Sequence, residues 1–87
     1  MRLYIVHCGF YDEQLADGVY EFHINIPVAA EDVEEAKREV RQHSTFRLKK
    51  MHIDGIQEIE TVSGRRVQLS EPEGHATQVT HHLHRDL

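Results

Sequence analysis

The sequence predicts one small α+β domain in which a single helix packs on one face of a mainly antiparallel sheet, in the order strand, strand, helix, strand, strand. Three observations lead to this fold class. Apolar and polar residues alternate near the N-terminus, the apolar period lengthens to that of a helix in mid-chain, and a glycine-containing hairpin pattern follows. A chain of 87 residues has room for one core, which we assign to residues 1–70.

The first strand is predicted over residues 2–8. Apolar side chains fall on both of its faces, because Leu3 and Ile5 share one parity while Val6 and Cys8 share the other. Strands that are apolar on both faces are typical of the middle of a sheet, so we expect a central position. A loop with an Asp-Gly turn signal is expected to follow, up to residue 18.

The second strand is predicted over residues 19–26, where the alternation is regular. Its core face is expected to carry Tyr20, Phe22, Ile24 and Ile26, and its other face Glu21, His23 and Asn25. Pro27 is expected to end the strand, because proline has no amide hydrogen to donate to the ladder.

A helix is predicted over residues 31–43. Its apolar stripe consists of Val33, Ala36, Val40 and His43. Acidic residues fill the first turns and basic residues follow, which is the order that the helix dipole favours. Ala30 is a poor N-cap, so we expect these acids to compensate for a missing cap. Residues 44–50 are predicted to be a polar connector.

A two-stranded ribbon is predicted over residues 51–69. Its first strand has Met51, Ile53 and Ile59 on one parity and His52, Asp54 and Glu58 on the other. Gly55 interrupts the alternation, which indicates a bulge or bend. A short turn containing Gly64 then leads into the return strand.

Composition and charge limit the classes of function. The formal net charge of −5 disfavours nucleic-acid binding, which requires a basic face. The alternative would need one contiguous patch formed by Arg47, Lys49, Lys50, Arg65 and Arg66. No apolar run is long enough for a membrane helix, and the N-terminus does not resemble a signal peptide, so we expect a cytoplasmic protein with no membrane partner.

Two segments resemble a known family. YEFHINIPVAAEDVEEAK and KKMHIDGIQEIETVSGRRVQL are similar, in order and spacing, to the bacterial domain-of-unknown-function family 1543. The resemblance implies a small ββαββ domain that sometimes occurs in tandem copies and has no established activity. It places Glu21, His23, His52 and Asp54 on the family's polar positions. The segment after the first strand departs from the family, whose members tend to be glycine-rich there.

The same four polar residues are the candidate functional cluster. Glu21 and His23 share one strand face, as do His52 and Asp54, so the four groups converge if the two strands lie side by side. Such a set suits a general acid–base pair, a site for a divalent metal such as zinc or nickel, or a hydrogen-bonded ladder on a solvent-exposed face. No motif for an activated serine or a phosphate-binding loop is present in the sequence.

Residues 71–87 are predicted to be a histidine-rich C-terminal tail. His82 and His84 would point the same way in an extended strand, and together with His75 or Cys8 they would suit zinc or nickel. The other interpretation is a mobile tail with no native metal. Cys8 as a nucleophile activated by His7 is disfavoured, because neighbours in a strand point to opposite faces.

These observations predict an interaction or ligand-binding module that is not an enzyme and that associates with itself, because so short a chain buries a small core. The alternative is a metal-binding protein or metal-dependent enzyme that uses Glu21, His23, His52 and Asp54.

Overall fold

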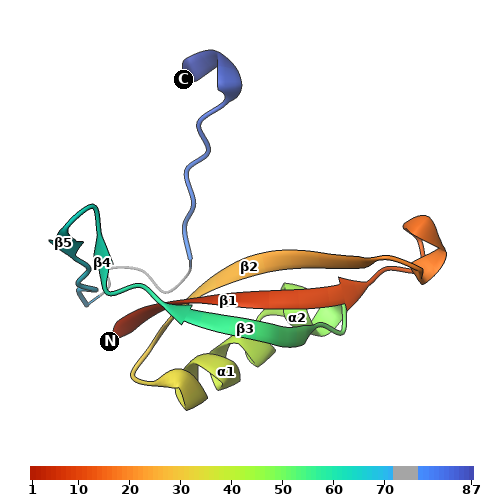
Figure 1. The fold of residues 1–87 in the computed structure, drawn as a ribbon, viewed down its shortest axis with the longest axis horizontal. Coiled ribbons are helices and arrows are strands. Elements are labelled where there is room, and N and C mark those ends of the chain that lie inside the picture. The colour runs from red at the N-terminus through yellow and green to blue at the C-terminus, as the bar shows by residue number, and fades with distance from the viewer. Residues whose placement is uncertain (72–76) are drawn as a thin grey trace.

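The computed structural model describes residues 1–71 and 77–87 and confirms the α+β fold class (Figure 1). A three-stranded antiparallel sheet has the order β2-β1-β3, with helices α1 and α2 on one face. The strands of this sheet are β1 (Arg2–Tyr11), β2 (Glu21–Ala30) and β3 (His52–Glu58). The helices are α1 (Val33–Gln42) and α2 (Ser44–Leu48), and a short hairpin consists of β4 (Thr61–Val62) and β5 (Arg65–Arg66).

Strand β1 occupies the centre of the sheet, as its two apolar faces predict. It is longer than expected, because Gly9, Phe10 and Tyr11 continue the pairing with β2. The predicted loop therefore begins only after Tyr11. It contains a 3₁₀ turn at Ala16–Gly18.

Strand β2 differs from the sequence prediction at both ends. Tyr20 precedes the strand and is 67% exposed, so its assignment to the core was wrong. Pro27 does not end the strand but lies within it, opposite Ile5 of β1. Among the described residues β2 pairs only with β1, and proline is tolerated on such an edge strand because half of the strand's N–H groups have no ladder partner.

A bulge in β3 changes the parity of its side chains. His7 pairs with Gly55 and Cys8 with Ile53, which leaves Asp54 as the extra residue of β3. Ile53 and Ile56, three positions apart, consequently both pack against the core. The predicted long ribbon is wrong, since β3 pairs with β1 and the hairpin that follows contains only β4 and β5.

The helical region has a different cap and one more helix than predicted. The Asp32 side chain caps α1 by accepting a hydrogen bond of 2.8 Å from the Glu35 amide, so the expectation that acids replace a missing cap was wrong. His43 is extended and ends α1, and its Nδ1 accepts from the Thr45 amide at the start of α2. The predicted connector therefore folds as α2.

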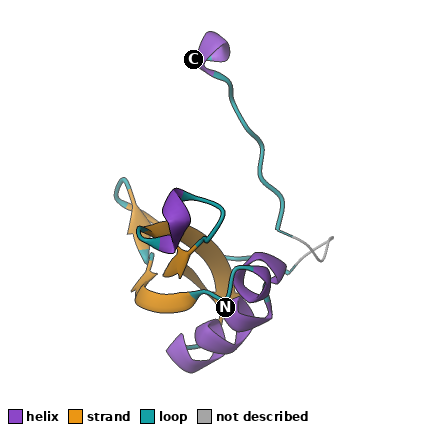
Figure 2. Ribbon diagram, turned by 90° about the vertical axis from the view of Figure 1, so that its right-hand side faces the viewer, coloured by secondary structure: helices purple, strands orange, loops and turns teal. Residues whose placement is uncertain are grey.

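The core lies between the sheet and the helices. Its buried side chains form two adjoining groups, one of Val6, Cys8, Ile26, Val40 and Met51, the other of Tyr4, Ala30 and Ala36. Full burial of a valine such as Val6 stabilises the fold by about 1.5–3 kcal/mol. Figure 2 shows both helices on one side of the sheet. We call the opposite side the open face.

Within the described ranges 1–71 and 77–87, no helix is long and apolar enough to cross a membrane. The predicted division into a domain of residues 1–70 and a tail of residues 71–87 stays a prediction, since residues 72–76 lie outside the described part.

Candidate functional site

Three residues form a row across the open face. Gly9 in the central strand pairs with His23 of β2 on one side and with His52 of β3 on the other. The predicted convergence of the four polar residues was conditional on β2 and β3 lying side by side, and this condition is not met because β1 lies between them. Adjacent strands are about 4.8 Å apart, so side chains of the two outer strands meet only if the residue between them is small.

The four predicted residues nevertheless converge above Gly9. His52 Nε2 lies 2.8 Å from Glu21 Oε1 and 3.1 Å from Asp54 Oδ1. His23 Nε2 lies 3.1 Å from the same Glu21 oxygen and 3.1 Å from Asp54 Oδ2. We call Glu21, His23, His52 and Asp54 the polar cluster. Each imidazole thus faces one oxygen from each carboxylate.

Gly9 provides the space that the polar cluster occupies. A Cβ atom at this position would lie 2.3 Å from Glu21 Oε1, 2.6 Å from Asp54 Oδ2 and 2.7 Å from His52 Nε2. These separations are too short for real contacts, so any side chain at Gly9 would displace the cluster. The backbone of Gly9 does not have positive φ. Glycine is required at position 9 because a side chain would collide with the polar cluster, and not because the backbone adopts a conformation that only glycine allows.

The β3 bulge positions Asp54. Because Asp54 has no partner residue on β1, it is the additional residue that the bulge inserts between Ile53 and Gly55. Bulges re-aim side chains and are frequent beside functional sites. Here the bulge brings both oxygens of Asp54 to the two histidines.

The polar cluster contains two carboxylates that have no lysine or arginine as an ion-pair partner among the described residues. In the described part of the chain, the ion pairs of Glu21 and Asp54 involve only His23 and His52. The four side chains are each between 30% and 47% exposed, so solvent and ions reach them. Among the described residues, the partners of the two carboxylates are the two imidazoles and the Tyr11 hydroxyl, which donates to Glu21 Oε2 at 3.5 Å. Two carboxylates without a lysine or arginine partner form a favourable environment for a cation.

Two further residues of this site, His7 and Asn25, were not predicted as part of it. His7 lies in β1, and its Nδ1 is 2.8 Å from Asn25 Oδ1 in β2. The His7 ring stacks on the His23 ring, with centroids 4.8 Å apart and an angle of 6° between the planes. A signal was present, because His7 shares the parity of Gly9, and an isolated glycine in a strand marks a close approach.

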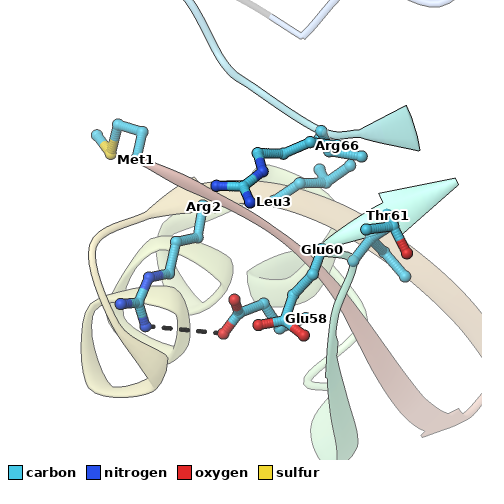
Figure 3. A pocket seen from close by; sticks show the side chains of 9 residues that line it. Met1, Arg2, Leu3, Glu58, Glu60, Thr61 and Arg66 are labelled. Atoms are coloured by element: carbon cyan, nitrogen blue, oxygen red, sulfur yellow. Dashed lines mark ion pairs between the residues drawn. The ribbon is translucent and has the colours of Figure 1, made fainter. Parts of the chain in front are cut away.

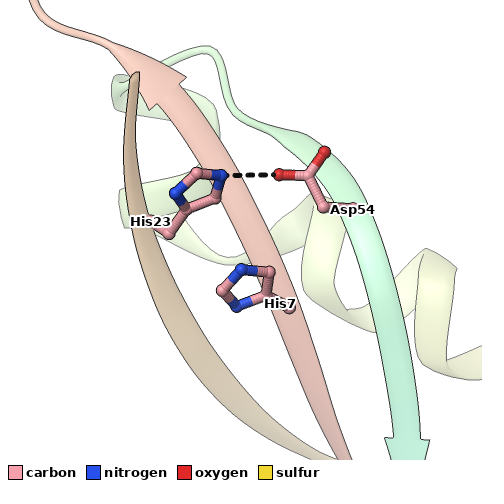
Figure 4. Close-up of side chains that lie close together, drawn as sticks. All are labelled: His7, His23 and Asp54. Atoms are coloured by element: carbon pink, nitrogen blue, oxygen red, sulfur yellow. Dashed lines mark ion pairs between the residues drawn. The ribbon is translucent and has the colours of Figure 1, made fainter. Parts of the chain in front are cut away.

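The arrangement is suited to metal binding. Two groups of side chains bring possible ligand atoms within 4.8 Å of one another, one formed by His7, His23 and Asp54, the other by Glu21, His52 and Asp54. Figure 4 shows the first group, with His23 in contact with Asp54 and His7 beside it. Imidazole nitrogen and carboxylate oxygen are ligands for zinc and other divalent transition metals.

The sequence profile of the family described as Domain of Unknown Function (DUF1543) matches residues 19–69, more than half of the chain. The chain belongs to the DUF1543 family. No curated protein and no solved structure matches it. The matched region of this DUF1543 domain contains the whole polar cluster, whereas His7 and Gly9 lie before it.

The tail histidines stand apart from the cluster. His82 and His84 are exposed, and among the residues that the structure describes they join no group of possible metal ligands. His75 lies outside the described residues. Cys8 is fully buried on the helix-covered face, so it is not available to the tail.

Cys8 also lacks the features of an activated nucleophile. Its side chain points into the core, whereas His7 lies on the open face. Burial raises the pKa of the Cys8 thiol, and the nearby Asp54 charge adds to this effect. A thiol with a raised pKa is a poor nucleophile at neutral pH.

A separate hollow of about 400 Å³ lies where the start of β1 meets the end of β3 and the hairpin (Figure 3). Its charged lining includes Arg2, which pairs with Glu58 at 3.7 Å, and Arg66. Lys49, by contrast, pairs with Asp12 beyond the other end of β1. The basic residues proposed for a nucleic-acid footprint therefore do not form one contiguous patch.

Proposed function

We propose that this DUF1543 domain binds a divalent transition-metal ion, such as zinc or nickel, at the polar cluster on its open face. One observation carries the proposal. The Nε2 atoms of two histidines from non-adjacent strands each lie within 2.8–3.1 Å of oxygens from both carboxylates. Two imidazoles and two carboxylates together match the ligand chemistry of zinc and its neighbours in the periodic table.

The distances between the histidine nitrogens and the carboxylate oxygens are close to those between the ligands of a bound ion, so an ion could enter with little rearrangement. Bond lengths of about 2.0–2.1 Å in a tetrahedral site separate neighbouring ligand atoms by roughly 3.3 Å. The four separations between a histidine nitrogen and a carboxylate oxygen, 2.8–3.1 Å, are only a few tenths shorter. Because the four side chains are partly exposed, small rotations would open the cluster. An ion would also neutralise the two carboxylate charges.

The competing explanation is a hydrogen-bonded ladder without an ion. Calorimetric titration with Zn²⁺ and Ni²⁺ distinguishes a metal site from such a ladder, provided that the histidines of the tail cannot bind the ions. We would use the full chain with His75, His81, His82 and His84 replaced by alanine, called the tail-substituted protein below. It is expected to bind at least one ion per chain, and a ladder would give no saturable binding.

Substitutions in the same background locate the ion. His52→Ala combined with Asp54→Ala is expected to abolish high-affinity binding. The matched control is His43→Ala with Asp86→Ala, which removes the same side-chain types outside the cluster and is expected to leave binding unchanged. Binding that survives the His52 and Asp54 substitutions would overturn the proposal.

Self-association is the second candidate, and an uncovered sheet face favours it. The open face carries the half-buried side chains of Leu3 and Ile5, and β2 and β3 each pair only with β1 among the described strands. Sheet edges and uncovered faces are surfaces on which a second copy docks. Light scattering of the untagged protein would give the mass of a dimer if this is correct, and of a monomer if it is not.

A further inference from the structure

Asp54 directs its two carboxylate oxygens to different histidines. Its Oδ2 atom is 3.1 Å from His23 Nε2, and its Oδ1 atom is 3.1 Å from His52 Nε2. Since each oxygen has its own lone pairs, a carboxylate in this position can bridge two ions. Glu21 differs, because a single oxygen, Oε1, faces both histidines.

The possible ligand atoms divide into two groups that share only Asp54. His7 and His23 belong to one group, and Glu21 and His52 to the other. Each group supplies three protein ligands once Asp54 is included. Three is the number found in zinc sites that keep a coordination position open for water or substrate.

His7 has the second contact that metal-ligating histidines need. Asn25 Oδ1 lies 2.8 Å from His7 Nδ1 and, as an amide oxygen, accepts a hydrogen bond from it. The tautomer that makes this contact has its free lone pair on Nε2, where a metal would bind. Metal-binding histidines typically donate their other ring N–H to an oxygen in this way. In the described residues His7 forms no ion pair, so the ladder of the polar cluster does not account for its position.

We propose that the polar cluster and His7 together hold two divalent transition-metal ions bridged by Asp54. This inference rests on the proposed function, because it requires that the cluster bind metal. One ion is held by His7, His23 and Asp54 Oδ2, and the other by Glu21, His52 and Asp54 Oδ1. The two ions are expected to lie about 3.5–4 Å apart, as in other two-metal sites.

The charge of such a centre indicates the class of its external ligand. Two divalent ions bring four positive charges, of which Glu21 and Asp54 neutralise two. A hollow of about 430 Å³ adjoins the site and is lined in part by His7, Asn25 and Gly55. The open coordination positions therefore suit a small anion, such as hydroxide, phosphate or a carboxylate.

The number of bound ions tests this inference separately from the proposed function. The tail-substituted protein would be saturated with Zn²⁺, dialysed, and measured by elemental analysis and calorimetric titration. Two ions per chain are expected. His7→Ala and His52→Ala are each expected to leave one ion, whereas His43→Ala, outside the site, is expected to leave two.

The possible outcomes separate the two proposals. One ion per chain, unchanged by His7→Ala, would overturn the two-ion centre and leave the proposed function intact. Two ions that both survive His7→Ala would also overturn it. No bound ion would overturn both proposals. Loading with Mn²⁺ provides an independent readout, since two bridged ions give the electron paramagnetic resonance spectrum of a coupled pair and isolated ions do not.

Discussion

Glu21 Oε1 lies 2.8 Å from His52 Nε2, although the two residues belong to strands that are not neighbours in the sheet. The contact crosses the central strand above Gly9, which has no side chain to obstruct it. The polar cluster is therefore a property of three strands at once. Replacing Gly9 in the middle strand is therefore expected to separate the side chains of the polar cluster, which belong to the two outer strands.

Gly9→Ala is the most specific structural test of this site. The added methyl group would meet Glu21, Asp54 and His52 at distances below 3.0 Å, so the cluster must move apart. We expect zinc affinity to fall by about 10–100-fold, the range seen when groups that orient ligands are lost. Calorimetric titration measures the affinity, and circular dichroism checks the fold.

Gly55→Ala is the matched control for Gly9→Ala. A Cβ at Gly55 would have no heavy atom within 4 Å, and this glycine does not have positive φ. Zinc affinity is expected to stay within about twofold of the parent value. An equal loss in both variants would show that Gly9 has no special role.

Ile26 tests the placement of the hydrophobic core, because it is 4% exposed and packs on the helix-covered face of the sheet. Ile26→Ala is expected to lower the free energy of unfolding by about 2–5 kcal/mol, because it leaves a cavity. Leu48→Ala removes the same number of carbon atoms from a side chain that is 81% exposed, and is expected to change stability by less than about 0.5 kcal/mol. Urea unfolding of both variants measures these changes, and similar effects would contradict the placement of the core.

Loss of the side-chain cap of α1 is expected to lower the free energy of unfolding by less than loss of a core side chain does. Asp32→Ala removes the acceptor for the Glu35 amide and is expected to cost about 1 kcal/mol. Asp32→Asn keeps an acceptor and should retain most of the stability. Thermal unfolding of the two variants tests this order, and equal melting temperatures would rule out the side-chain cap.

Stability is expected to depend on pH through Asp12. The hydrogen bond from the Lys49 ammonium group, with a second one from the Gln14 amide, lowers the pKa of Asp12 below its ordinary value of 3.8. The folded state therefore favours the charged carboxylate. This stabilisation is present above about pH 3.8 and is lost as the pH falls through the lower pKa of the folded state.

Comparison with Asp12→Asn isolates that contribution. The parent protein is expected to be more stable than the variant at pH 7, and the difference is expected to shrink below pH 3.8. Chemical unfolding at several pH values measures the difference. A gap that stays constant down to pH 2 would contradict the assignment.

Sequence patterns were most informative where a local period determined the outcome. Alternation placed Glu21, His23 and His52 on the open sides of their strands, and the polarity of the helix was clear from its charges. Those features depend on neighbours within a few residues. The same reasoning found the interruption near Gly55, because the apolar parity changes there.

Features that depend on the whole sheet were not predictable in this way. The tolerance of Pro27 follows from its position on an edge strand, which a single segment does not reveal. The sequence pattern predicts a loop at Gly9, whereas this residue pairs with His23 and His52 and joins them in one row. The strand order decides which polar faces meet, and it is set by tertiary packing.

The polar cluster is proposed as a metal site. The most direct test of this proposal is an anomalous diffraction map of the tail-substituted protein crystallised with Zn²⁺. We expect a peak about 2.0–2.2 Å from the Nε2 atom of His23 or His52 and from a carboxylate oxygen of Asp54. Crystals grown with saturating Zn²⁺ that show no peak at these side chains would contradict it.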